Sequence, residues 1–163
     1  LAVYQDAKLA LIEDQHGNKP FTPDFTAKLK MQGFEGKYGS TVIAIKYRYT
    51  DLVDMGYKDY PTGYLWRYGV EAQYNFHMGT ERWGAAPFVG FGIMKRASTR
   101  AQNSWEFGGE LTYKITNWFS VGAEGVMMER PELGKYVFNG SLGIQFNINT
   151  DYGTKQAKKG SRF

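Results

Sequence analysis

The sequence predicts an all-β fold, an eight-stranded antiparallel up-and-down transmembrane β-barrel. Three observations lead to this prediction: apolar and polar residues alternate along most of the chain, the alternating stretches are long, and tight turns alternate with looser polar loops. The composition agrees with it. Aromatic residues make up 17% of the chain and there are 20 Gly against 5 Pro, a mixture that favours strands.

The clearest alternation runs from Trp66 to Met78, where every second residue is apolar and the residues between them are polar or glycine. Successive side chains of a strand point to opposite faces, so this pattern predicts a strand with one apolar and one polar face. Similar runs occupy residues 25–32, 41–49, 105–115 and 136–148. Two glycine-rich runs at residues 85–95 and 119–128, and a weaker run at residues 2–13, bring the expected number of strands to eight.

Strand length and connection length both favour a membrane. Several runs reach about ten to thirteen residues, whereas strands of globular domains average about six and a tilted membrane strand needs about nine to eleven. The tight turns at residues 33–39, 79–84 and 116–118 alternate with connections at residues 15–24, 52–64, 97–103 and 130–133, as periplasmic turns alternate with extracellular loops. We therefore expect residues 1–148 to form the barrel and residues 149–163 to form a basic periplasmic tail.

The direction of the polar face separates two kinds of barrel. A soluble barrel of the lipocalin type turns its apolar face inward, but here the polar face carries many charges that would ruin an apolar pocket. We therefore expect the polar face to line a narrow, plugged lumen in which opposite charges pair. The predicted luminal charge cluster comprises Lys28, Lys30, Lys46, Arg48, Arg67, Glu71, Glu106, Glu110 and Glu124.

Two sequence segments resemble the periplasmic turns and flanking aromatic belt of a known family. They are YNFHMGTERWGAAPFVGFG and TNWFSVGAEG. This family is that of the small eight-stranded outer-membrane barrels typified by OmpA and OmpX, with similar domains in Bacteroidota. The last strand is similar to the family's C-terminal insertion signal at Ser141, Gly143, Phe146 and Ile148, although Ile148 stands where the family has an aromatic residue. Belts are expected at Tyr64 and Trp66 on the outer side and at Tyr74, Phe76, Trp83, Trp118 and Phe119 on the inner side.

The sequence argues against several biochemical roles. The chain has no cysteine, no metal-ligand cluster and no placed nucleophile near His16 or His77, so we expect no catalytic residue, no metal and no cofactor. The formal charge of +4 is spread along the chain without a nucleic-acid-binding motif. The expected location is the cell outer membrane, and the expected partners are its lipid and lipopolysaccharide.

Three functions stay open at this point. The first is a structural barrel or an accessory subunit of a larger outer-membrane complex. The second is a surface adhesion or ligand-binding barrel that acts through its extracellular loops, and the third is a narrow ion channel. No predicted loop exceeds about thirteen residues, which leaves little surface for adhesion. The sequence therefore favours the structural or accessory role.

Overall fold

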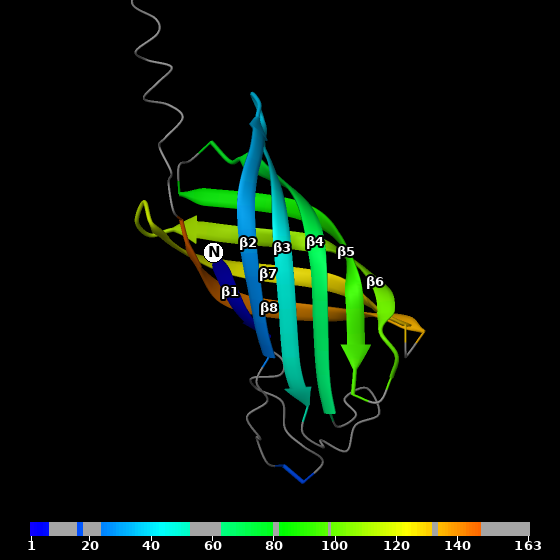
Figure 1. Cartoon of the computed structure of the whole chain (residues 1–163). Helices are drawn as coiled ribbons and strands as arrows, with labels where there is room; N and C mark the ends of the chain where they lie inside the picture. Colours follow the sequence, from blue (N-terminus) through cyan, green and yellow to red (C-terminus); the bar gives the residue numbers. More distant parts are fainter. Residues whose placement is uncertain are drawn as a thin grey trace, which may run out of the picture.

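In a computed structural model the chain forms a closed barrel of eight antiparallel strands, which confirms the predicted fold class (Figure 1). The structure describes residues 1–6, 16–17, 24–52, 63–79, 82–97, 99–131 and 134–147. Within these residues there is no helix that is long and apolar enough to span a membrane.

The strands follow one another around the ring in chain order, each paired with its neighbours in the sequence. The first and last strands close the ring through a register that runs from Ala2 opposite Gln145 to Asp6 opposite Ser141. A closed ring leaves no unpaired edge strand. The strands are β1 Ala2–Asp6, β2 Asp24–Glu35, β3 Gly39–Leu52, β4 Gly63–His77, β5 Trp83–Arg96, β6 Gln102–Lys114, β7 Phe119–Arg130 and β8 Lys135–Phe146.

Strand boundaries differ from the prediction mainly at the ends. Asp24, expected in a loop, is the first residue of β2, because the pairing with β3 continues to Thr50. Trp83, expected in a turn, lies in β5 opposite Tyr113 of β6. In both places hydrogen bonding continues past the point where the polarity pattern fades. Residues 7–13 of the expected first strand, Ile148 and the tail at 149–163 lie outside the described residues.

The two faces of the wall are those that the alternation predicts. The outward Val70 and Leu142 are 54% and 62% exposed, whereas the neighbouring Glu71 and Ser141 are buried in the lumen. The same alternation holds on β2, β3 and β6. The barrel therefore has an apolar outer surface and encloses its charged residues, the reverse of a soluble ligand-binding barrel.

The interior contains one apolar region that the polarity pattern did not predict. Leu65, Phe88, Met94, Val126 and Met128 form a buried apolar cluster inside the barrel, contributed by β4, β5 and β7. The alternation did not reveal it because β5 is apolar on both faces, with Phe88 and Met94 inward and Val89 outward. The lumen is thus filled partly by ion pairs and partly by apolar packing.

Two glycines make room for a large ring inside the wall. Tyr4 of β1 lies opposite Gly143 of β8, which in turn lies opposite Gly122 of β7. A Cβ atom built on Gly143 would lie 2.1 Å from the Val3 carbonyl oxygen and 2.6 Å from the Tyr4 ring. On Gly122 it would lie 3.0 Å from the Tyr4 hydroxyl. Gly143, expected in the insertion signal, therefore also accommodates the buried Tyr4.

We expect Gly143→Ala to lower the free energy of unfolding by about 1 to 3 kcal/mol, because the added methyl group overpacks a closed site. The matched control is Gly140→Ala on the same strand, where the added Cβ would lie 3.7 Å from the Phe138 ring in ordinary contact. Urea unfolding in detergent or lipid measures both variants. Equal unfolding midpoints for the two variants would contradict this packing role of Gly143.

Candidate functional site

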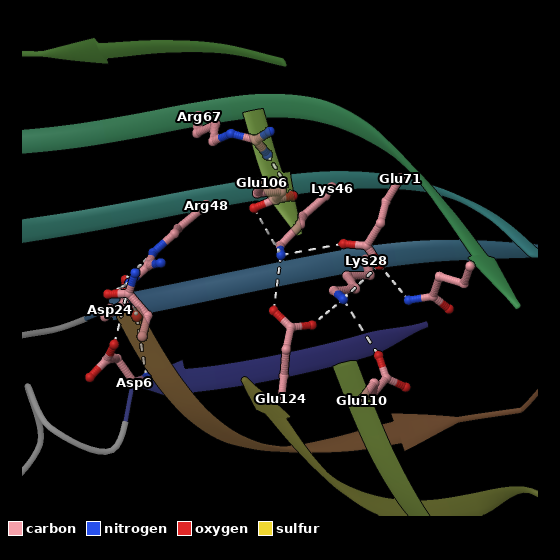
Figure 2. A network of polar contacts seen from close by, with 12 residues as sticks. Asp6, Asp24, Lys28, Lys46, Arg48, Arg67, Glu71, Glu106, Glu110 and Glu124 are labelled. Atoms are coloured by element: carbon pink, nitrogen blue, oxygen red, sulfur yellow. Dashed lines mark hydrogen bonds and ion pairs between the residues drawn. The ribbon is translucent and has the colours of Figure 1, made fainter. Parts of the chain in front are cut away.

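The candidate site is a network of ion pairs across the lumen, built on inward positions of five strands (Figure 2). The strand register places Lys28 of β2 beside Lys46 of β3, and Glu110 of β6 beside Glu124 of β7. One wall of the barrel is therefore cationic and another is anionic. Lys28 and Lys46 meet Glu110 and Glu124 across the lumen, and Lys46 also contacts Glu71 of the neighbouring strand β4.

Each of the two central lysines contacts three carboxylates. The Lys46 Nζ lies 2.9 Å from Glu124 Oε1, 3.3 Å from Glu106 Oε2 and 3.4 Å from Glu71 Oε2. The Lys28 Nζ lies 2.9 Å from Glu71 Oε1 and 3.4 Å from Glu110 Oε2, and it also pairs with Glu124. An ammonium group has three N–H donors, so each lysine has as many carboxylates within ion-pairing distance as it has donors.

The network continues toward both ends of the barrel. Toward the end where β4 begins, Arg67 Nη1 donates to Glu106 Oε1 at 2.8 Å and Nη2 donates to the Ser104 carbonyl oxygen at 3.1 Å. Toward the opposite end, Lys30 pairs with Glu110 and donates to Gln145 Oε1 at 2.9 Å. The connected cations and carboxylates balance in number and comprise Lys28, Lys30, Lys46 and Arg67 with Glu71, Glu106, Glu110 and Glu124.

These charges are removed from water. The side chains of Lys28 and Glu71 have no exposed surface. Lys30 is the one side chain of the network that is more than a tenth exposed, at 13%. The ring of Phe88 lies beneath both lysines, with its centroid 4.5 Å from Lys28 Nζ and 5.2 Å from Lys46 Nζ. The negative face of an aromatic ring adds to the stabilisation of buried cations.

Arg48, the remaining residue of the predicted cluster, belongs to a separate group of ion pairs. Its Nε donates to Asp24 Oδ1 at 2.9 Å and its Nη2 donates to Asp24 Oδ2 at 3.0 Å, a two-pronged pairing. Asp6 Oδ2 lies 3.5 Å from the same Nη2, and the Thr50 hydroxyl also donates to Asp24. The sequence pattern placed Asp24 in a loop, although its position directly before an alternating run was an available signal for a strand residue.

The predicted belt residues lie outward near the strand ends. Tyr64 and Trp66 stand near the start of β4, with the Trp66 ring 5.4 Å from Tyr68. At the opposite end, the rings of Tyr74 and Phe76 are 5.0 Å apart and those of Trp83 and Tyr113 are 4.9 Å apart. A third aromatic group there consists of Trp118, Phe119 and Phe146.

The four residues expected in an insertion signal have different surroundings. Ser141 is buried in the lumen, Gly143 lies against Tyr4, and Phe146 joins the aromatic group of Trp118 and Phe119 on the outward face of the barrel. Ile148 lies outside the described residues.

Acidic groups of the described lumen are engaged with cations rather than grouped for metal binding. Among the residues that the structure describes, no three His, Cys, Asp or Glu side chains stand together as a metal site. The side chain of His77 lies outside that part of the chain. The chemistry that this arrangement supports is electrostatic cross-linking of the barrel wall.

Comparison with known proteins identifies a similar fold. No protein-family model and no curated protein matches the sequence. Among solved structures, the chain is similar to the Yersinia pestis outer membrane protein Ail in a phospholipid bilayer nanodisc, with a TM-score of 0.58 and 15% sequence identity. The match covers 90% of this chain and 97% of Ail. The two proteins share the small-barrel fold.

We expect Glu124→Ala to lower the free energy of unfolding by about 3 to 5 kcal/mol, because it removes a carboxylate that pairs with both of the buried lysines Lys28 and Lys46. The control is Glu35→Ala at the exposed end of β2, where a surface substitution should change stability by no more than about 0.5 kcal/mol. Denaturant unfolding midpoints in lipid vesicles measure both. An unchanged midpoint for Glu124→Ala would show that the lumen is hydrated enough to screen the pair.

Proposed function

We propose that this chain is an integral outer-membrane barrel with a plugged lumen that serves as a structural or accessory component of the membrane. One observation carries the proposal: a charge-balanced, buried ion-pair network fills a ring whose outer surface is apolar. The resemblance in fold to an outer membrane protein supports the location.

The outward face supports insertion into a bilayer. Large apolar side chains such as Ile43, Val70 and Leu111 are about half exposed along the middle of their strands. Such a surface is unfavourable in water but suits hydrocarbon, and the aromatic groups at both ends of the strands match the girdles of membrane barrels. Strands of twelve to fifteen residues in β2 to β8 are long enough to cross the bilayer at a tilt.

The luminal contacts support a plug rather than a pore. Lys28 and Lys46 connect carboxylates from three other strands, so side chains span the bore at this level. The apolar cluster of Leu65, Met94 and Met128 fills the lumen toward the ends of β5 and β7. An eight-stranded barrel is only wide enough for side chains, and these residues use that space for packing.

The same arrangement supports an accessory role. The charged side chains of the network engage one another, which leaves them to stabilise the wall rather than to react with a substrate. A barrel that is stabilised internally and apolar externally can act by packing within the membrane. Cross-linking in native outer membranes, followed by purification and mass spectrometry, identifies the proteins that contact it.

An arginine scan of the outer surface tests the membrane assignment. Arginine at Val70, Leu111 or Leu142 should cost about 2 to 4 kcal/mol, and the cost should fall to about 0 to 1 kcal/mol near Tyr64 and Phe76, because charge is hardest to hydrate at mid-bilayer. Equilibrium unfolding from lipid vesicles provides the measurement. A penalty that is independent of position along the strand would contradict membrane insertion.

Planar-bilayer recording tests the plug. The purified barrel should show no steady conductance, since paired side chains occupy the bore at Lys46 and Glu71. Glu71→Ala and Lys46→Ala each widen the bore at this position and are compared with the unaltered chain. Lys37→Ala in the exposed turn is the control. Reproducible openings of the unaltered chain that disappear in the Lys46 or Glu71 variants would support the narrow-channel alternative instead.

A further inference from the structure

A polar cavity opens at the end of the barrel where the β2–β3, β4–β5 and β6–β7 turns lie. Its volume is about 670 Å³, and its lining residues come from β2, β3, β4, β6 and β8, from Leu1 and from the residues that follow β6 and β8. We call it the vestibule. Its size falls within the range of about 300 to 1,000 Å³ that is typical of small-molecule sites.

The back of the vestibule is an ordered chain of hydrogen bonds. Lys30 Nζ donates to Gln145 Oε1 at 2.9 Å, Gln145 Nε2 donates to Asn147 Oδ1 at 2.7 Å, and Asn147 Nδ2 donates to Ser120 Oγ at 3.2 Å. The charge of Lys30 is compensated by Glu110. These bonds fix the amide planes of Gln145 and Asn147, so the back wall is pre-organised.

The remaining polar side chains of the vestibule have no partner among the described residues. Lys114 has no carboxylate within ion-pairing distance there, and Gln32, Asn75 and Asn117 make no side-chain hydrogen bond with the described part of the chain. Neither Asp nor Glu occurs among the residues that line the cavity. The vestibule therefore presents the uncompensated cation of Lys114 together with free amide groups.

We propose that the vestibule binds a small anionic sugar, a sugar acid or sugar phosphate, and this goes beyond the proposed structural role. Lys114 supplies the cation for the carboxylate or phosphate. Each amide offers an acceptor oxygen and two donor hydrogens, which match the donor and acceptor capacity of sugar hydroxyl groups. Val42, which also lines the cavity, provides apolar surface for the C–H face of a sugar ring.

The test uses the full chain folded in detergent micelles, with glucuronate, glucose and acetate as probes in isothermal titration calorimetry. We expect saturable binding of glucuronate with a Kd at least tenfold lower than that of either glucose or acetate. Lys114→Gln and Asn75→Ala should each weaken glucuronate binding at least tenfold. Lys37→Gln is the matched control, an exposed lysine in the β2–β3 turn that does not line the vestibule.

Several results would overturn the proposal. These are the absence of saturable glucuronate binding, acetate binding as tight as glucuronate binding, and equal weakening by Lys37→Gln and Lys114→Gln. Circular dichroism and heat-dependent gel mobility verify that each variant is folded. If Lys114→Gln does not fold, Asn117→Ala replaces it with the same tenfold expectation, because Asn117 lies in the turn outside the strands.

Discussion

The structure depends on closure of the ring by the pairing of β1 with β8. The described pairing extends only from Ala2 opposite Gln145 to Asp6 opposite Ser141, yet it joins the two ends of an otherwise open sheet. Closure pairs the backbone N–H and C=O groups that edge strands would otherwise leave free. It also fixes the width of the interior at that of two facing side chains. Each inward residue must then be compatible with the residue across the lumen.

Closure of the ring explains why like charges lie on adjacent strands. Lys28 stands beside Lys46, and Glu110 stands beside Glu124, so each hairpin taken alone brings like charges together. Like charges directly opposite one another weaken a strand pair. When the ring closes, the cationic β2–β3 wall faces carboxylates from β6 and β7, and the repulsion within each hairpin is replaced by attraction across the lumen. The network therefore favours the closed barrel over isolated hairpins.

The two ends of the lumen have different chemistry. Toward the ends of β5 and β7, the apolar cluster with Met94 and Met128 and the pairing of Arg48 with Asp24 fill the interior. Toward the turns, the vestibule retains free amides and the uncompensated Lys114. The central ion pairs separate these regions, because Lys28 and Lys46 link strands on opposite sides of the bore. The two ends of the barrel therefore differ in the side chains that line them.

The sequence by itself determined the strand number, the direction of each face and eight of the nine predicted residues of the luminal charge cluster, because these follow from a local alternation of period two. Only the tertiary structure decided which inward side chains contact one another. Lys28 and Glu110 are 82 positions apart, and their contact depends on the register of every strand between them. The same holds for Asp24 with Arg48, for Tyr4 over Gly143, and for the apolar cluster around Phe88. Local patterns encode which face a side chain occupies, whereas only ring closure and the accumulated register determine which side chain it meets.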